Sequence, residues 1–220
     1  MKERPGMYTR TDSPTHICQE VIDNAADEAL GNYADTINVE IHADGSLSVS
    51  DNGRGIPTGL HPTEGVAVAE LVFTQLHAGG KFNKKDSDSA YGFSGGLHGV
   101  GVSVTNALST RLEVTIKREG KIWKMAFEHG FVVEPLTQTG KCLIKDSGTY
   151  VRVYPDSKYF ESPHYNVVEL ERLLRAKAVL LPGVTVSFIR PIKGLPESHT
   201  QTWHYPNGLK GYLVDLISEA

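Results

Sequence analysis

Paired segments that alternate apolar and polar side chains constrain the fold more than any other feature of this sequence. Residues 37–42 and 46–50 alternate on either side of Asp44-Gly45, a dipeptide typical of tight hairpin turns. The other segments with a strand pattern are residues 111–118, 121–128, 149–154 and 184–189. Glu119-Gly120 separates the first two of these in the same way. Because hairpins pair their strands antiparallel, we predict a mixed, mostly antiparallel sheet.

Helical patterns interleave with these strands without a repeated βαβ rhythm. They cover residues 14–30, 65–77, 100–109, 166–181 and 208–219. Pro182-Gly183 is a stop signal for the fourth helix. We therefore predict an α+β fold, a two-layer sandwich with the helices on one face of the sheet. Residues 190–200 are expected to be a plain connector.

Length and composition indicate one globular domain spanning residues 1–220. The chain is 40% hydrophobic, which suffices for a sizeable core. Its net charge is -4, so it lacks the global basic field of a nucleic-acid-binding domain, and DNA contact by this chain alone is not expected. Cys18 and Cys142 are far apart and are expected to be reduced. The sequence has no apolar run of membrane-spanning length and no signal-peptide core, so we expect a soluble, cytoplasmic protein without membrane contact.

The helix at 14–30 carries a polar arc beside its apolar one. Glu20, Asn24 and Glu28 are spaced by four residues and share one helical face, with Asp27 beside them. An asparagine oxygen can join a Mg²⁺ shell, and a neighbouring carboxylate can polarise a water for attack on a phosphate. Taken alone, such an arc is more often a solvated acidic helix face, because acidic residues are ordinary on helix surfaces.

A second motif, Asp51-Asn52-Gly53-Arg54-Gly55-Ile56-Pro57, follows a predicted hairpin strand. A carboxylate held at a strand end can accept a hydrogen bond from the exocyclic amine of adenine, which guanine lacks at that position. The alternative interpretation is an ordinary Asp-Asn-Gly turn.

A third motif, Gly95-Gly96-Leu97-His98-Gly99-Val100-Gly101, leads into the helix predicted at 100–109. Glycines permit close backbone approach, and a helix N-terminus favours an anion such as a triphosphate. The spacing matches neither the Rossmann nor the P-loop fingerprint, and a tight helix start is the alternative. The polar, glycine-rich stretch before it, residues 79–96, is predicted to be a mobile lid rather than an inert loop. In this order, the three motifs predict an ATP site.

The same motifs resemble the ATP-binding fold, here termed the GHKL ATPase fold, shared by type II DNA topoisomerases, Hsp90, MutL repair proteins and sensor histidine kinases. Within that superfamily the chain is similar, over essentially all its residues, to the ATPase domain in the B subunit of bacterial type II topoisomerases. It is most like the B subunit of topoisomerase IV and next like that of gyrase. The segments that carry this resemblance are 4–8, 19–24, 76–82 and 93–101.

The resemblance implies roles for individual residues. Glu20 would be the general base, Asn24 the protein ligand of Mg²⁺, and Asp51 the reader of adenine. Thr149 would complete the adenine contact, and Arg54, Pro57 and Arg118 would form a rim used by competitive ATP-site inhibitors. The ATP-contacting set that the resemblance implies is Tyr8, Asn24, Glu28, Asp51, Gly55, Ile56, Pro57, Lys81, Tyr91, Gly96, Leu97, His98, Gly99, Val100, Gly101 and Thr149.

The resemblance also implies a larger assembly. Such enzymes combine two copies of the B subunit with the A subunits on duplex DNA, and ATP-driven closure powers DNA strand passage. The family's longer N-terminal arm, transducer domain and DNA-cleavage domains are not found in this sequence, so we expect a monomer that hydrolyses ATP poorly. Alternative functions are a gyrase domain, a chaperone or mismatch-repair clamp, a histidine kinase domain, and a non-catalytic nucleotide-binding module.

Overall fold

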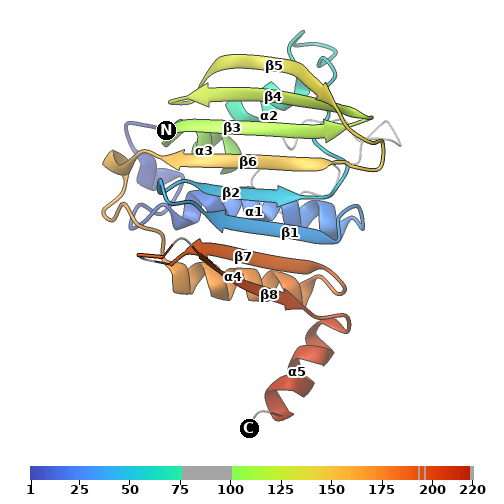
Figure 1. Ribbon diagram of the computed structural model, residues 1–220. Coiled ribbons are helices and arrows are strands. Elements are labelled where there is room, and N and C mark those ends of the chain that lie inside the picture. Colours follow the sequence, from blue (N-terminus) through green and yellow to red (C-terminus); the bar gives the residue numbers. More distant parts are fainter. Residues whose placement is uncertain (76–100, 193, 196, 219–220) are drawn as a thin grey trace.

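The computed structural model describes residues 1–75, 101–192, 194–195 and 197–218. Within these ranges the strands form an eight-stranded sheet in the order β5-β4-β3-β6-β2-β1-β7-β8 (Figure 1). β1 and β7 pair in parallel, and the other six neighbouring pairs are antiparallel. The predicted mixed, mostly antiparallel sheet is therefore confirmed.

The strands are β1 (Thr36–Ile41), β2 (Leu47–Asp51), β3 (Ser109–Arg118), β4 (Lys121–Glu128), β5 (Phe131–Lys141), β6 (Gly148–Pro155), β7 (Thr185–Pro191) and β8 (Ser198–His204). Two predicted hairpins occur as expected. At the β3–β4 turn, Glu119 and Gly120 adopt φ angles of 53° and 72°, the left-handed pair that a type I′ turn requires. At the β1–β2 turn, Gly45 has φ of 81°.

The helices are α1 (Thr15–Leu30), α2 (Val68–Thr74), α3 (Gly101–Ala107), α4 (Val167–Leu180) and α5 (Gly208–Ser218). Short 3₁₀ turns occur at Pro5–Met7 and Ser157–Tyr159. Helices α1 to α4 lie behind the sheet on one face, whereas α5 projects from the β8 end (Figure 1). This arrangement confirms the predicted two-layer α+β class.

Burial explains why α1 occupies the centre of the helical layer. Its apolar arc packs on the sheet against Leu47 and Val49 of β2, both almost fully buried. The buried residues of α1 are Thr15, Ile17, Cys18, Val21, Ile22, Ala25, Ala26 and Ala29. Helix α4 packs beside α1, and its Lys177 pairs with Asp23 of α1 at 2.7 Å. The polar arc of α1 is thereby held in a fixed orientation.

The structure also corrects several sequence expectations. Residues 190–200 are not a plain connector, because β7 extends to Pro191 and β8 begins at Ser198. α2 is shorter than the predicted 65–77, and the strands β5 and β8 are not predicted by the sequence analysis. β5 and β8 are the two edge strands of the sheet and have few buried side chains, so their sequences show little alternation. In the part of the chain that is described, no helix has the length and apolarity needed to cross a membrane.

Candidate functional site

The polar arc of α1 extends from the start of α3, which Glu20 contacts, to the loop after β2, which Glu28 contacts. Glu20 and Glu28 are partly buried, and Asn24 between them is exposed. Glu20 also lies against the start of α3, since a Cβ added at Gly101 would collide with the Glu20 carboxylate. Glycine at position 101 thus lets the start of α3 approach Glu20 closely.

Asp51 ends β2 and turns its carboxylate back toward the following loop. Its Oδ1 accepts a hydrogen bond from the Gly53 backbone N–H at 2.8 Å. Burial raises the pKa of Asp51 to about 6, and the nearby Glu28 carboxylate adds to the rise, while backbone hydrogen bonds from Gly53 and Thr149 oppose it. Near neutral pH, Asp51 is therefore a largely desolvated acceptor, and a partner that donates a hydrogen bond to it would be favoured.

Glu28 holds the loop after β2 in place. Its Oε1 pairs with Arg54 Nη2 at 2.7 Å, and its Oε2 accepts from the Arg54 backbone N–H at 2.9 Å and from Nε at 3.2 Å. The Arg54 guanidinium stacks over the Tyr33 ring, 3.3 Å from its centroid. A bidentate contact and a stacked plane together fix both the main chain and the side chain of Arg54.

Two glycines bring three strands close together beside Asp51. A Cβ at Gly55 would lie 2.7 Å from the Lys117 carbonyl oxygen, and one at Gly148 would collide with the Asp51 backbone. Gly55 also has φ of 74°, which disfavours other residues there. Across this junction the Ile56 N–H donates to Thr149 Oγ1 at 3.3 Å, and Arg118 Nη1 donates to the Gly55 carbonyl at 2.8 Å.

The structure therefore brings together most of the described residues that the resemblance implicated. Glu28, Asp51, Arg54, Gly55, Ile56, Arg118 and Thr149 form one contiguous group, and Pro57 follows Ile56 half-buried. Sequence reasoning missed Tyr33 and Gly148, and it quoted Gly53 in the second motif without giving it a role. A signal existed for Gly148, since a glycine directly before Thr149 is compatible with close backbone approach.

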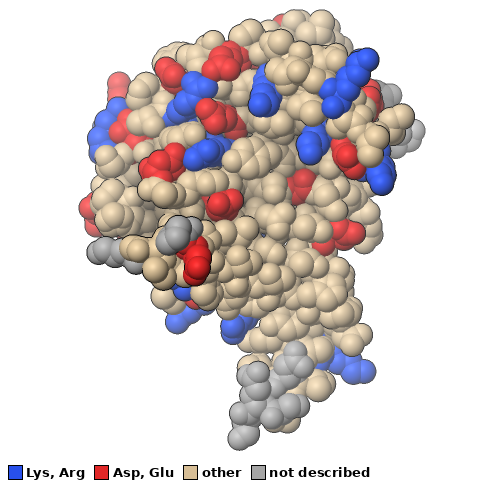
Figure 2. All heavy atoms as spheres, in the orientation of Figure 1, with Lys and Arg blue, Asp and Glu red and all other residues tan. Residues whose placement is uncertain are grey.

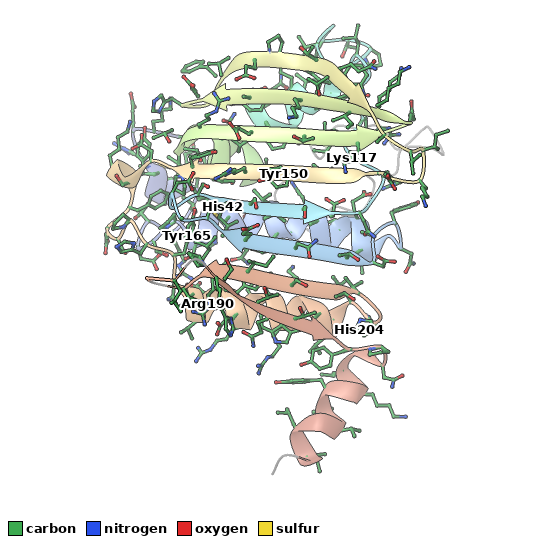
Figure 3. All side chains as sticks on the ribbon, viewed as in Figure 1. His42, Lys117, Tyr150, Tyr165, Arg190 and His204 are labelled. Carbon is green, nitrogen blue, oxygen red and sulfur yellow. The ribbon has the colours of Figure 1, made fainter. Side chains whose placement is uncertain are left out.

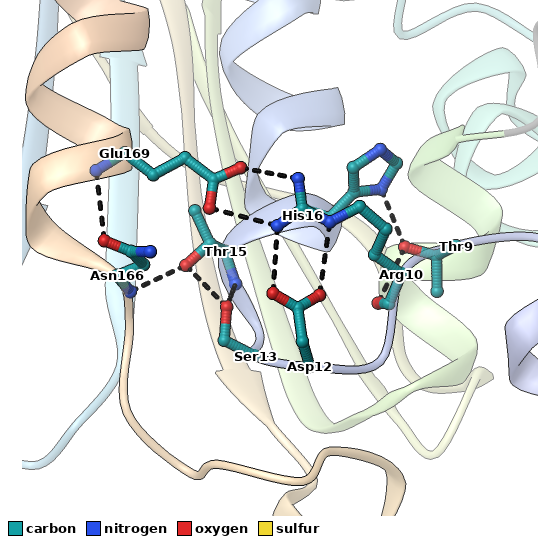
Figure 4. A network of polar contacts seen from close by, with 8 residues as sticks. All are labelled: Thr9, Arg10, Asp12, Ser13, Thr15, His16, Asn166 and Glu169. Carbon is teal, nitrogen blue, oxygen red and sulfur yellow. Dashed lines mark hydrogen bonds and ion pairs between the residues drawn. The ribbon is translucent and has the colours of Figure 1, made fainter.

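Tyr8 is not in this group. It is exposed and lies next to Thr9, whose hydroxyl contacts His16 Nδ1 at 2.8 Å near the first turn of α1 (Figure 4). Glu28 is twelve residues further along the same helix, or roughly 18 Å at 1.5 Å per residue. Arg10 fixes this N-terminal segment to α4 through Glu169 at 2.8 Å. An ATP contact by Tyr8 therefore stays a prediction, because the described contacts do not connect Tyr8 with this group.

Seven further site predictions lie outside the described residues, as does the predicted lid at 79–96. They are Lys81, Tyr91, Gly96, Leu97, His98, Gly99 and Val100. Their implied contacts stay predictions.

A groove of about 500 Å³ lies next to the group, between the ends of α1 and α4. Its lining includes Leu30, Tyr33, Asn52 and residues 180–184, but none of the implicated ATP contacts and no Lys or Arg. Two of its polar residues are bonded to each other, since Asn52 Nδ2 donates to Asp35 Oδ1 at 2.6 Å. Without a cation in its lining, the groove is a poor place for a triphosphate.

The donor chemistry of the α1 arc fits Mg²⁺. Magnesium binds oxygen ligands and is commonly held by one or two protein groups, with phosphates and waters completing its shell. Asn24 offers an amide oxygen on an exposed helix face, one turn from Glu20. In the described ranges no group of three His, Cys, Asp or Glu side chains could hold a metal by itself. Oxygens of a bound phosphate would therefore have to be among the ligands of such a magnesium.

Comparisons with known proteins agree with this geometry. Residues 9–158 match the family described as histidine kinase-, DNA gyrase B-, and HSP90-like ATPase. The chain belongs to that family.

Among its relatives, the chain is 48% identical to the B subunit of DNA topoisomerase 4 from Escherichia coli, over 99% of this chain and 33% of the relative. It is 44% identical to the B subunit of DNA gyrase from Thermotoga maritima, over 98% of this chain and 33% of the relative. It thus spans about a third of the length of these curated relatives.

A solved structure, the topoisomerase IV ATP-binding domain of Francisella tularensis in complex with a small-molecule inhibitor, superposes with a TM-score of 0.83. It is 40% identical, and the match covers 99% of this chain and 56% of that one. The chain is therefore an ATPase domain homologous to those in the B subunits of topoisomerase IV and gyrase, as the sequence motifs predict.

Proposed function

We propose that this domain binds ATP with Mg²⁺ between α1 and the loop after β2 and hydrolyses it. In this proposal it is the ATPase domain of a bacterial type II DNA topoisomerase of the topoisomerase IV kind. The observation that carries the proposal is Asp51, a desolvated acceptor at a strand end next to a loop that Glu28 and Arg54 hold rigid. The chain is more similar to topoisomerase IV than to gyrase, which favours the first, and a gyrase domain is the second candidate.

Asp51 selects the base in this proposal. Its carboxylate accepts a hydrogen bond from the adenine amine, while the Gly53 N–H keeps the carboxylate oriented. Gly55 and Gly148 let the loop after β2, β3 and β6 approach one another closely, which holds Asp51 and Thr149 at the same junction. The Thr149 hydroxyl, already accepting from Ile56, donates its own proton toward the base or a bridging water.

Glu20 and Asn24 serve the phosphate chemistry. Glu20 accepts a proton from the attacking water, and its place against Gly101 positions it at the start of α3. Asn24 is the protein ligand of the metal. When bound, Mg²⁺ neutralises phosphate charge and orients the terminal phosphate.

In the whole enzyme, we propose that this domain works with a second copy of itself, with the A subunits of the topoisomerase and with duplex DNA, in the bacterial cytoplasm where that DNA lies. ATP binding would favour closure of two copies, and closure would drive DNA strand passage, decatenation and relaxation. The Francisella tularensis domain is in complex with a small-molecule inhibitor, and we propose that competitive ATP-site inhibitors bind this chain too, with Arg54, Pro57 and Arg118 as the rim of their site.

Calorimetric titration with a non-hydrolysable ATP analogue and Mg²⁺ tests the proposal. The chain should bind the ATP analogue but not the GTP analogue, and Asp51→Asn should weaken binding roughly 10- to 100-fold, since a hydrogen bond to a charged acceptor contributes about 1.5–3 kcal/mol. The exposed Asp146→Asn is the matched control and should bind like the original protein. Equal binding of both analogues, or unchanged binding by Asp51→Asn, would refute the adenine site.

A further inference from the structure

The ends of α1 and α4 lie side by side because of how the strands that follow them pair. α1 leads into β1 and α4 leads into β7, and these two strands run parallel, with Thr36 opposite Thr185. The Thr185 N–H donates to the Asp35 carbonyl oxygen at 2.8 Å, which joins the two helix-to-strand connections. The groove of about 500 Å³ lies between these connections. The pairing that orders the sheet therefore also builds the groove.

Both helices point the negative ends of their dipoles toward this groove. α1 has 16 residues and α4 has 14, so each carries a partial negative charge at its C-terminus. The last turn of α1 has no basic residue. The last turn of α4 has Lys177, whose Nζ is paired with Asp23 of α1 at 2.7 Å. Two partial negative charges therefore face the groove, and the one cation in these last turns is already paired.

A carboxylate adds a full negative charge to the two helix ends. Asp35 lines the groove, is exposed, and has no ion pair with a described residue. Its Oδ1 accepts hydrogen bonds from Asn52 Nδ2 at 2.6 Å and from Thr36 Oγ1 at 2.8 Å. These bonds lower the pKa of the Asp35 carboxyl, so it is charged at neutral pH.

Positive charge is scarce around the groove. None of the residues that line it is Lys or Arg. In the space-filling view, most Lys and Arg lie over the half of the sheet formed by β3, β4 and β5, and few lie over β1 and β7 (Figure 2). Figure 3 shows two basic residues near this end of the sheet, Lys117 on β3 and His204 on β8. Strands β6 and β2 separate Lys117 from β1, and His204 Nδ1 contacts Thr185 Oγ1 at 3.2 Å.

The walls of the groove are apolar although they are open to solvent. Leu30 of α1 is 56% exposed, and Leu180 of α4 is 68% exposed. Tyr33 adds a half-exposed aromatic ring, and the Arg54 guanidinium stacked on that ring is already paired with Glu28. Leucines exposed to this extent at the ends of two adjacent helices provide an apolar surface that a ligand can cover.

These features together select one class of ligand. The volume is that of a small-molecule site. The negative helix ends and Asp35, without a cation in the lining, disfavour an anion, and the leucine walls disfavour a bare metal ion, which prefers oxygen ligands. An organic ammonium ion matches both properties, because its charged group is attracted to the helix ends and Asp35 while its apolar body covers the leucines and Tyr33.

We propose that the groove between the ends of α1 and α4 binds a small organic ammonium ion with an apolar body. This inference goes beyond the proposed function, since none of the implicated ATP contacts lines the groove. The groove adjoins the adenine-binding group through Tyr33 and Asn52, but it takes a ligand of the opposite charge to ATP.

Ligand-observed NMR titration with three probes of similar shape tests the charge preference. The probes are phenethylammonium, the neutral phenethyl alcohol and the anionic phenylacetate. Phenethylammonium should bind with a Kd on the order of 1 mM, as expected for a ligand of about nine non-hydrogen atoms. The alcohol should bind at least about 5-fold more weakly and the carboxylate more weakly still, because the helix ends and Asp35 attract only the cation. Equal binding of the three probes would overturn the proposal.

Substitutions in the wall of the groove test its location. Leu180→Lys adds a fixed cation there and should weaken phenethylammonium binding at least about 10-fold, whereas Asp35→Asn should weaken it about 2- to 5-fold, since pairing with an exposed carboxylate is screened. Leu143→Lys is the matched control, because Leu143 is 60% exposed and lies outside the groove. It should bind like the original chain. Unchanged binding by Leu180→Lys, or an equal loss in Leu143→Lys, would overturn the proposal.

Competition separates this inference from the proposed function. A saturating ATP analogue should leave phenethylammonium binding within about 3-fold, and full displacement would overturn the groove by placing the probe in the nucleotide site. Probe binding with the expected charge preference by a chain that does not bind the ATP analogue would support the groove and refute only the proposed function. A tetrapeptide of alternating leucine and lysine that binds at least about 10-fold more tightly than phenethylammonium would overturn the small ligand in favour of a basic protein segment.

Discussion

The two ends of the candidate ATP site are built differently, although both start from α1. The base end consists of Glu28, Asp51, Arg54 and Thr149, which α1, β2, its following loop and β6 contribute. The phosphate end consists of Glu20 and Asn24 on α1 and Gly101 at the start of α3. At the base end each group is held by described contacts from other elements, whereas the phosphate end has one exposed amide and one carboxylate against a glycine.

This difference is expected from what each end has to do. Selecting a base requires fixed, desolvated polar groups, because a misplaced acceptor does not discriminate adenine from guanine. Phosphate chemistry requires groups that complete their contacts only with metal and substrate in place. Substitutions at the phosphate end should therefore change rate, and substitutions at the base end should change affinity and stability.

The largest effect is expected at the phosphate end. In the full-length protein, Glu20→Gln should lower kcat by about 10²- to 10⁴-fold, because it removes the base that takes the proton from water, and should leave analogue binding within a few-fold. Steady-state ATPase assays and calorimetry on the same preparation measure both. The exposed Glu64→Gln is the control, and a Glu20→Gln protein with full turnover would show that the base is another residue.

A smaller effect, in stability, is expected for Asp51. Its pKa of about 6 in the folded chain lies above the ordinary value of 3.8, so the charged carboxylate costs stability above pH 6, and this cost falls as the pH drops from 6 toward 3.8. Asp51→Asn should therefore be about 3 kcal/mol more stable to unfolding than the original chain near pH 7.5, with about half that gain near pH 5. Urea denaturation at both pH values measures this gain.

Asp146→Asn serves as the matched control for that series and should show no gain at either pH. A gain for Asp51→Asn that grows on acidification would have the wrong sign and would show that Asp51 is stabilised, not strained, by its surroundings. Loss of nucleotide affinity together with a gain in stability is the expected signature of a binding carboxylate.

The smallest effect is expected for Arg54→Lys. An ammonium cannot contact both Glu28 oxygens and stack on Tyr33, so we expect a loss of about 1 kcal/mol in unfolding free energy and at most about a 3-fold loss in analogue affinity. Arg111→Lys, which also loses a multiple carboxylate contact, should affect stability alone. Equal affinity losses in both variants would mean that Arg54 has no particular relation to the site.

The central part of the fold could be predicted from the sequence because burial there imposes a period on the side chains. Val39 on β1 and Val49 on β2 are buried, and polar residues alternate with them in the sequence, so this alternation predicts the first hairpin. β5 and β8 are edge strands, and in β8 Trp203 is the buried residue, so nothing in their sequence distinguishes them from loops.

The site shows the same division. The spacing of Glu20, Asn24 and Glu28 predicts a shared face because a helix has a fixed period, and α1 confirms that face. Spacing could not predict that Arg54 would lie between Glu28 and Tyr33, because that contact depends on how the loop after β2 meets the end of α1. Contacts between two elements can be predicted only when the fold is known, because the residue pattern within one element does not determine them.

The parallel pairing of β1 with β7 has a consequence for how the chain folds. Thr36 pairs with Thr185, so these neighbours are separated by roughly 150 residues of sequence, while β1–β2 and β3–β4 form from adjacent segments. Closing so long a loop costs entropy before any contact is gained, and topologies rich in such pairs fold slowly. The β7–β8 hairpin and α4 should therefore join a partly formed sheet late, and until they do β1 is an open edge at which nascent chains can associate.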